Sequence, residues 1–301
     1  MLLPEWPIVL SYGMGVDSTA MLIGLERRNI RPDLILFADT GGEKDETYAY
    51  LPVMNAWLES VKFPQVEVVR YEPKNFKNWP PYYTLEDNCL TNGTLPSLAF
   101  GFKSCSLKWK VAPQEAFLKR WPRAQEVWAF GGKVHKMIGY DCGPKDMRRR
   151  NHLGEQNDPL FQYEYPLIDW GWDRERCADE ISKAGLPVPP KSSCFFCPAM
   201  KPCEVDALPK DLLRRIVRME VRAAPRLETI EGLWRTSTKT RPGSMTAYIA
   251  DKGLLAIDEI EQIKASTSDE IVSYQLGYAQ AKAARRSAEF ESLHKACDYR
   301  H

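Results

Sequence analysis

Apolar runs and amphipathic stretches alternate along the first half of the chain. Residues 7–11, 33–39 and 65–70 form short apolar runs, which predict buried strands. Residues 17–28 and 45–60 lie between these runs and space their apolar side chains as a helix does. Because strands alternate with helices, we expect an α/β fold in which helices cover both faces of a parallel sheet.

The alternating pattern is weaker in the middle of the chain. Residues 73–104 are rich in proline, asparagine and aromatic residues and show little periodicity, which indicates a long loop or lid. Strand character resumes in residues 126–130 and 136–140.

The alternation stops after residue 198. Residues 208–233 and 255–297 are charged and have helical character. We therefore expect two domains, residues 1–200 and residues 201–301, of which the second is mainly helical.

Composition narrows the class of protein. The 301 residues balance 41 Lys and Arg against 40 Asp and Glu, which excludes a polybasic tail protein and an acidic disordered protein. No apolar run approaches the roughly 20 residues of a membrane span, and the N-terminus lacks the features of a signal peptide. Eight cysteines without a secretory signal indicate a reducing, cytoplasmic compartment, where clustered cysteines suggest metal or redox chemistry.

Residues 11–19, Ser-Tyr-Gly-Met-Gly-Val-Asp-Ser-Thr, follow the first predicted strand and open the first predicted helix. Such a glycine loop brings backbone N–H groups and a helix N-terminus to one place, which suits a phosphate. A Walker A loop requires a lysine that is missing here. A dinucleotide fingerprint, with Ser18 as its third small residue and Asp39 as the ribose acid, is one alternative. A plain glycine turn is another.

The end of this loop, Gly15-Val16-Asp17-Ser18-Thr19, resembles the Ser-Gly-Gly-x-Asp-Ser motif of the PP-loop ATP pyrophosphatases, in their PAPS-reductase-like branch. Gly13 and Met14 stand where Ser and Gly are usual, and Ser11 lies two residues earlier. Four later segments are similar to the branch in the same order. They are Asp39-Thr40-Gly41, Ile138-Gly139-Tyr140 with Asp146 and Arg149, Tyr165–Trp170, and Gly185-Leu186-Pro187.

This resemblance implies a HUP or adenine-nucleotide-alpha-hydrolase-like sheet that binds ATP with Mg²⁺. The residues that it implies for nucleotide binding lie in or beside these segments. They are Ser11, Tyr12, Gly13, Met14, Gly15, Asp17, Ser18, Thr19, Asp39, Thr40 and Gly139. The implied catalytic residues are Asp17, Ser18, Lys110 and Arg149.

Phosphate chemistry suggests a role for each group in the loop. The hydroxyls of Ser11, Ser18 and Thr19, with the backbone amides, would hold the pyrophosphate. Asp17 would orient the loop, help to hold Mg²⁺, or simply cap the helix. The guanidinium of Arg149 would clamp a phosphate, or belong to a solvated basic surface.

Cys194 and Cys197 form a Cys-x-x-Cys pair, and Cys203 follows six residues after Cys197. Cys105 and Lys110 match the Cys-Cys-x-x-x-Lys-x-x-Pro segment of cluster-bearing APS reductases. In this chain Ser106 stands in place of the second cysteine. The match implies a [4Fe–4S] cluster on Cys105, Cys194 and Cys197, with Cys203 as a fourth ligand or a separate thiol. Zinc, a redox pair and inert thiols remain alternatives.

Several other residues have both a functional and a structural interpretation. The functional interpretation of His135 is that it contacts phosphate or acts as an acid or base. The structural interpretation is that it is an ordinary surface or core histidine. Trp79, Tyr82, Tyr83 and Trp109 stack on a base or pack within a long loop. The basic residues of 148–150 and 213–226 contact nucleic-acid phosphates or form solvated faces.

We therefore expect an enzyme that cleaves ATP to AMP and pyrophosphate, so that adenylylation activates an oxygen that sulfur then replaces. Among known families, the chain most resembles the ATP pyrophosphatases of Dnd/Ssp-type DNA phosphorothioation, which share the PAPS-reductase-like core. This resemblance implies that a cysteine desulfurase donates the sulfur. It also implies that the substrate is DNA or another nucleic acid, which the chain contacts through partner proteins. The alternatives are a PAPS or APS reductase that uses Cys297, and a nucleotide-sensing subunit without turnover.

Overall fold

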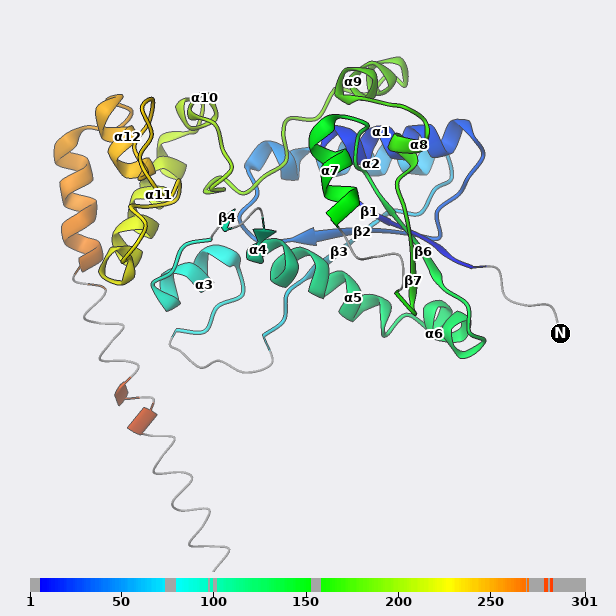
Figure 1. The fold of residues 1–301 in the computed structure, drawn as a ribbon, viewed down its shortest axis with the longest axis horizontal. Coiled ribbons are helices and arrows are strands. Elements are labelled where there is room, and N and C mark those ends of the chain that lie inside the picture. Colours follow the sequence, from blue (N-terminus) through cyan, green and yellow to red (C-terminus); the bar gives the residue numbers. More distant parts are fainter. Residues whose placement is uncertain are drawn as a thin grey trace, which may run out of the picture. The chain divides into compact units, whose positions relative to one another are not determined.

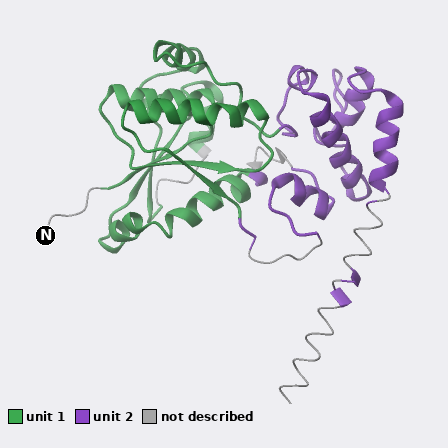
Figure 2. Cartoon of the chain, turned by 180° about the vertical axis from the view of Figure 1, so that it is seen from behind, with its two compact units in different colours: residues 1–71, 106–194 green, residues 72–105, 195–301 purple. Residues whose placement is uncertain are grey.

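The computed structural model divides the chain into two compact units (Figure 2). The first unit contains residues 1–71 and 106–194, and the second contains residues 72–105 and 195–301. Residues 72–105, which the sequence-based division places in the first domain, therefore group with the second unit. The structure describes residues 6–73, 80–96, 98–99, 102–152, 158–268, 270, 279–280 and 282–283.

The first unit is built on a five-stranded sheet in the order β3-β2-β1-β6-β7 (Figure 1). All four neighbouring pairs are parallel. The strands are β1 (Ile8–Ser11), β2 (Leu34–Asp39), β3 (Val66–Arg70), β6 (Val134–Ile138) and β7 (Phe161–Glu164). The predicted parallel α/β fold is confirmed, and the strand order is that of Rossmann-like folds.

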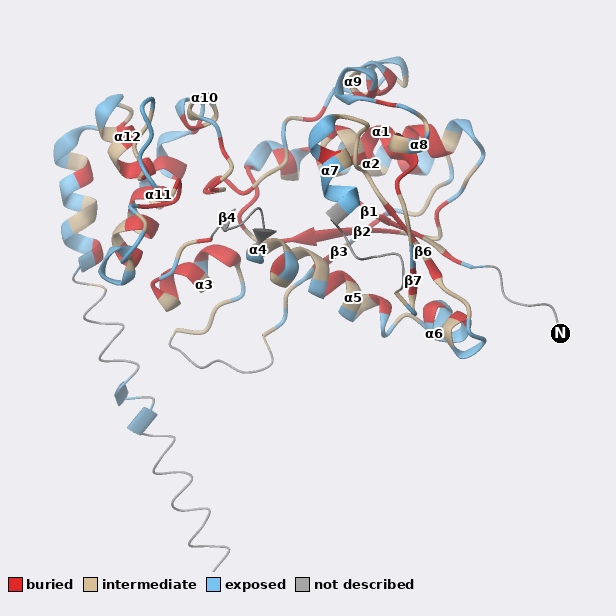
Figure 3. Ribbon diagram, viewed as in Figure 1, coloured by how far each residue is buried: buried red, intermediate tan, exposed pale blue. Residues whose placement is uncertain are grey.

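Helices bury both faces of this sheet (Figures 1 and 3). Leu10, Ile35 and Phe37 face one layer, whereas their neighbours Val9 and Leu36 face the other. The first layer contains α1 (Val16–Arg27), α2 (Asp45–Ser60), α8 (Pro166–Asp169) and α9 (Arg174–Lys183), and the second contains α5 (Ala112–Leu118) and α6 (Pro122–Ala129). Because both faces are covered, the strands are apolar at successive positions rather than at alternate ones.

The predicted strand at residues 126–130 is wrong, because most of it lies in helix α6. Pro122 occupies the first turn of that helix, where a missing N–H costs nothing. Ala124 and Val127 are both buried and lie three residues apart, as one helical face requires. The predicted strand at residues 136–140 is confirmed in part by β6.

Residues 73–104 are not the structureless loop that their composition suggests. Helix α3 (Leu85–Asn92) begins where Thr84 accepts a hydrogen bond from the Asp87 N–H and ends at Gly93, which has a φ of 58°. Two short antiparallel strands follow, β4 (Leu98–Ala99) and β5 (Phe102–Lys103). Trp79 lies outside the described residues.

The second unit is helical in its described C-terminal part, which confirms the predicted helical C-terminal region. Its helices are α10 (Pro202–Asp206), α11 (Lys210–Ala223), the 3₁₀ turn η3 (Ala224–Arg226), α12 (Met245–Asp251) and residues 257–268. Helix α11 packs against α3, where Arg222 Nε donates to the Leu90 carbonyl at 2.7 Å. None of the helices in the described ranges is long and apolar enough to cross a membrane. Cys297 lies outside the described residues.

Candidate nucleotide and metal site

The strand order places a topological switch point between β1 and β6. From β1 the chain continues to β2 and β3 on one side, and later to β6 and β7 on the other. Ligands of open α/β sheets bind beyond the carboxyl ends of the strands at such a point. The loops after β1 and β6 meet there, since a Cβ added to Gly139 would lie 2.9 Å from the Ser18 backbone nitrogen. Gly139 therefore lets the end of β6 touch the first turn of α1.

The glycine loop that follows β1 has a specific backbone shape. Met14 has a φ of 53°, in the left-handed region that favours glycine, and its side chain is buried. Ser18 Oγ accepts a hydrogen bond from the Gly13 N–H at 3.2 Å and donates to the Gly15 carbonyl at 3.2 Å. Met14 thus adopts a backbone conformation that favours glycine, the residue that usually stands at this position in the motif that the loop resembles.

The N-terminus of α1 is suited to an anion. Gly15 is its N-cap residue, and among the described side chains none caps it. The first N–H groups of a helix lack intrahelical acceptors, and the helix dipole places partial positive charge there. The loop therefore presents backbone N–H donors at the switch point, where the sequence analysis expects a phosphate.

Two of the predicted phosphate-binding hydroxyls have protein partners. Ser11 Oγ donates to Gln114 Oε1 at 2.8 Å. Thr19 Oγ1 and the Tyr12 hydroxyl lie 3.2 Å apart in the core, and burial raises the pKa of Tyr12 above its ordinary value. These contacts attach the loop to α5 and α1.

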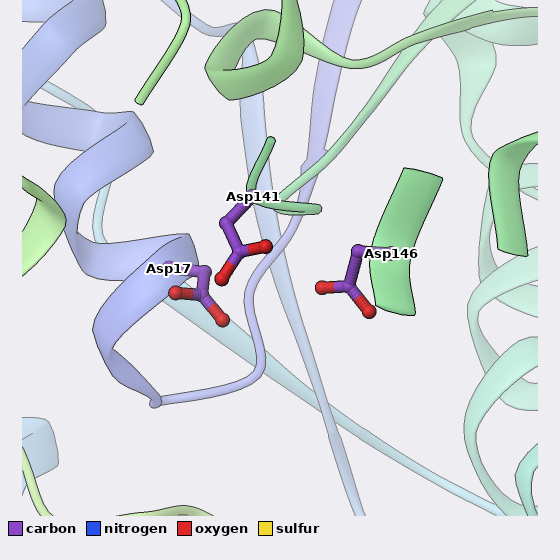
Figure 4. Close-up of side chains that lie close together, drawn as sticks. All are labelled: Asp17, Asp141 and Asp146. Atoms are coloured by element: carbon purple, nitrogen blue, oxygen red, sulfur yellow. The ribbon is translucent and has the colours of Figure 1, made fainter. Parts of the chain in front are cut away.

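Three carboxylates gather beside this loop (Figure 4). Asp17 comes from the first turn of α1, Asp141 from the segment after β6, and Asp146 from the first turn of α7 (Pro144–His152). One oxygen of each lies within 4.8 Å of the others. We call Asp17, Asp141 and Asp146 the acidic triad.

Two arginines offset part of the triad's charge. Arg174 Nη1 donates to Asp17 Oδ2 at 2.7 Å, and Arg149 Nη1 donates to Asp146 Oδ1 at 2.8 Å. Burial raises the pKa of Asp17, Arg174 opposes that rise, and Asp141 and Asp146 add to it. Asp17 Oδ1 is shielded from solvent and has no hydrogen-bond partner among the described residues. The donor set of hard carboxylate oxygens, with one of them unpartnered, fits a divalent cation such as Mg²⁺.

The carboxyl end of β2 carries the predicted Asp39 and Thr40. Asp39 Oδ1 accepts from the Gly41 N–H at 2.8 Å and from the Tyr48 hydroxyl at 2.7 Å. Its Oδ2 accepts from Arg70 Nε and Nη2 at 2.9 and 2.8 Å. Both carboxylate oxygens of Asp39 therefore organise the loop and tie β2 to β3.

The predicted catalytic residues fall into two groups. Asp17, Ser18 and Arg149 lie at the switch point, around the acidic triad. Lys110 instead lies on the π-helical turn η1 (Leu107–Val111), and its Nζ donates to Glu43 Oε1 at 2.8 Å. Glu43 follows β2, is buried, and leaves its Oε2 without a partner among the described residues.

The predicted cluster cysteines are distributed over both units. Cys194 belongs to the first unit, where its Sγ lies 3.3 Å from Thr40 Oγ1; Cys105, Cys197 and Cys203 belong to the second. None of these four forms a disulfide. Within the described part of the chain no cluster of thiols is evident, and the acidic triad is the group whose spacing suits a metal. The [4Fe–4S] cluster and its zinc alternative stay predictions.

Other candidates have structural contacts. His135 Nδ1 bonds to Glu164 Oε1. Trp109 is buried, and its ring centroid lies 4.8 Å from that of Tyr71, whereas Tyr83 is exposed.

Sequence reasoning missed two residues of this site, Asp141 and Arg174. Asp141 had a usable signal, because an acid that directly follows a strand lies at the carboxyl edge of the sheet. Arg174 had none, because it lies 157 residues from Asp17 along the chain.

These features define a class, a Rossmann-like α/β protein with a glycine loop and an acidic triad at the topological switch point. No family model matches the sequence, and no curated protein matches it either.

Proposed function

We propose that the protein is a PP-loop-type ATP pyrophosphatase, which cleaves ATP between its α- and β-phosphates. The observation that supports this most is the acidic triad beside the uncapped N-terminus of α1. A helix N-terminus attracts phosphates, but three carboxylates within 4.8 Å of one another repel them. A divalent cation that lies between the carboxylates and the phosphates would attract both and so remove this repulsion. Nucleotide polyphosphates usually bind with such a cation.

The chain's own residues would then position the nucleotide. The N–H groups of the first turn of α1 would donate to phosphate oxygens, and Ser18 keeps the loop closed through its bonds to Gly13 and Gly15. Asp17, Asp141 and Asp146 would hold Mg²⁺, which neutralises charge on the phosphates when bound. Arg149 and Arg174 keep two of the three carboxylates in place.

We further propose that AMP is transferred from ATP to an oxygen of a nucleic acid while pyrophosphate is released. Sulfur would then displace this oxygen, which leaves as part of AMP. This part rests on the likeness of segments 11–19, 39–41, 138–149 and 165–187 to the PAPS-reductase-like branch. A cysteine desulfurase would supply the sulfur as a persulfide, and a thiol reductant would supply the two electrons that release it. Cys105, Cys194, Cys197 and Cys203 would carry the [4Fe–4S] cluster. Cys194 lies beside Thr40, at the same carboxyl edge as the glycine loop.

The test is product analysis after incubation with ATP and Mg²⁺. AMP and pyrophosphate are expected, whereas ADP and phosphate would indicate cleavage at the other bond. Asp17→Asn and Asp141→Asn should each lower the rate about 100-fold or more, because each removes a charged metal ligand. Asp179→Asn is the matched control, since Asp179 is exposed on α9.

Two results would contradict the proposal. One is the absence of pyrophosphate in the presence of Mg²⁺. The other is full activity in both triad variants. Sulfite release that Cys297→Ser abolishes would instead support the reductase alternative.

A further inference from the structure

A basic segment of the second unit lies between α11 and α12 in the chain. Residues 235–241 read Arg-Thr-Ser-Thr-Lys-Thr-Arg, and we call them the basic knuckle. No Asp or Glu occurs from residue 232 to residue 250. Residues 236–240 are all exposed, and the segment between α11 and α12 contains exposed stretches in Figure 3. The knuckle therefore exposes Lys239 and the hydroxyl-bearing residues Thr236, Ser237, Thr238 and Thr240, whereas Arg235 and Arg241 are half-buried.

Hydrogen bonds fix the shape of the knuckle. The Trp234 N–H donates to the Gly243 carbonyl at 2.9 Å, and the Thr238 N–H donates to the Arg241 carbonyl at 2.8 Å. The Glu231 carboxylate accepts from the Ser237 N–H at 2.7 Å and from its hydroxyl at 2.5 Å. The loop is thus preorganised, so that a ligand would not have to order it.

A buried carboxylate anchors the base of the knuckle. Glu220 of α11 is 5% exposed and accepts four hydrogen bonds. The donors are the N–H groups of Leu233, Met245 and Thr246 and the hydroxyl of Ser244. These bonds hold both ends of the loop on α11.

Three arginines of α11 form ion pairs with carboxylates, whereas the cations of the knuckle form none within the described ranges. On α11, Arg214 pairs with Glu259, Arg215 with Glu86, and Arg218 with Glu270. In the described part of the chain, no carboxylate forms an ion pair with Arg235, Lys239 or Arg241.

Arg241 is also held in place by an aromatic ring. Its guanidinium lies 4.5 Å from the centroid of the Trp234 ring, and its Nη1 has no acceptor among the described residues. Three arginines of α11 are therefore paired with carboxylates, whereas the three cations of the knuckle have no ion pair among the described residues.

We propose that the basic knuckle binds the phosphodiester backbone of a nucleic acid. Arginine and lysine side chains, serine and threonine hydroxyls and backbone N–H groups are the groups that contact phosphates in such complexes. The knuckle combines them on one hydrogen-bonded turn, in which the Glu231 carboxylate is bound to the N–H and hydroxyl of Ser237 and forms no ion pair with the knuckle's cations among the described residues. The choice of nucleic acid as partner rests on the proposed function. The contact is direct, and it lies on the knuckle rather than on residues 213–226, whose arginines are paired within the fold.

The experiment compares the full-length wild-type chain with a double variant, Arg235→Gln with Lys239→Gln. Its matched control is Lys119→Gln with Arg120→Gln, which removes the same charges from exposed positions in the first unit. Fluorescence anisotropy would measure binding to a short DNA duplex and to an RNA hairpin over a range of salt concentrations. The probe that binds more tightly shows whether DNA or RNA is the preferred nucleic acid.

The knuckle variant should bind about tenfold or more weakly. The slope of log affinity against log salt should fall by about 0.9 for each lost contact to duplex DNA, or about 1.8 in total. The control should keep the wild-type slope. The proposal is overturned if knuckle variant and control behave alike, or if the wild-type chain binds neither nucleic acid.

Two further measurements keep this result independent of folding and of the proposed function. Lys239→Gln alone changes only the exposed tip and should lower the slope by about 0.9. Pyrophosphate release without nucleic acid should be equal in wild type and knuckle variants. If the wild-type chain releases no pyrophosphate, but the knuckle variant binds nucleic acid more weakly than the wild type does, the proposed function is contradicted. The proposal that the knuckle binds nucleic acid is then still supported.

Discussion

Gly139 and Gly13 both lie in glycine-containing segments at the switch point, but the space around them differs. A Cβ at Gly139 would meet the backbone of Ser18 at 2.9 Å, whereas the nearest atom to a Cβ at Gly13 is Ser18 Oγ at 3.9 Å. Backbone atoms of a helix cannot move aside as a flexible side chain can. Gly139 is therefore needed for contact between two chain segments.

Gly139→Ala should lower the free energy of unfolding by about 1–3 kcal/mol, because the added methyl group overpacks the β6–α1 contact. Gly13→Ala, the matched control, should change it by much less. Denaturant unfolding of both variants is the measurement. Equal losses would show that the close approach has no energetic importance.

Cys177 shows how burial near the acidic triad suppresses reactivity. Burial, with a smaller contribution from Asp17 and Asp141, raises the pKa of its thiol from 9.0 to about 12. At about pH 8 only about one thiol in 10,000 would then be ionised. Brief treatment of the folded protein, freed of any bound cluster, with iodoacetamide should modify the exposed Cys203 and spare the buried Cys177, as peptide mass spectrometry would report. Equal labelling would contradict this.

The same pKa shift predicts a trend in stability. Above pH 9 the unfolded thiol loses its proton while the folded thiol keeps it, so the folded state binds more protons. The contribution of Cys177 to the free energy of unfolding is therefore complete below pH 9 and is lost as pH rises toward 12.

At the scale of elements, a buried carboxylate joins α1 and α9. Glu180 is fully buried and pairs with Arg27 of α1, with Arg176 at 2.7 Å and with Lys183 at 3.3 Å. The side chains of the three cations are 37%, 52% and 54% exposed, so that solvent screens each pair in part. The pairs fix the position of α9, which carries Arg174 to Asp17.

Glu180→Gln should cost about 2 kcal/mol, between the values for exposed and fully buried ion pairs. Asp179→Asn, at the exposed neighbouring position, should leave stability nearly unchanged. Thermal or denaturant unfolding of the two variants would measure the difference. A loss in the control as large as that in Glu180→Gln would argue against a specific α1–α9 pairing.

Local patterns predicted most elements, and longer-range contacts explain the exceptions. Strands β1 and β2 and helices α1 and α2 follow from apolar runs and helical spacing. Residues 126–130 read as a strand because Val127 and Trp128 favour strands, but packing of Ala124 and Val127 selects a helix. Helix α3 was missed although Thr84 and Gly93 mark its two ends.

The same distinction applies to the site. The glycine loop identified Asp17 and Ser18, because the motif is local. Asp141 could have been predicted from its position just after a predicted strand. Arg174 could not, because only the fold brings its segment beside Asp17. The roles of Asp39 and Lys110 depend likewise on Arg70 and Glu43, which only the fold places beside them.

At the scale of the whole molecule, each unit is assembled from segments far apart in the chain. Residues 72–105 interrupt the α/β unit and pack with the C-terminal helices, where Arg222 and Arg226 donate to carbonyls at the end of α3. Composition alone could not show this, because the helix that α3 packs against lies far along the chain, where Arg222 is 132 residues from Leu90. The division of the chain separates the acidic triad, in the first unit, from the basic knuckle, in the second.

The central claim is that the acidic triad holds a divalent cation together with a nucleotide. Electron paramagnetic resonance with Mn²⁺ in place of Mg²⁺ would measure ion binding in the presence of a non-hydrolysable ATP analogue. We expect one ion per chain, bound about tenfold or more weakly by Asp141→Asn and equally well by Asp179→Asn. Wild-type affinity in Asp141→Asn, or no bound ion in the wild-type protein, would contradict the account.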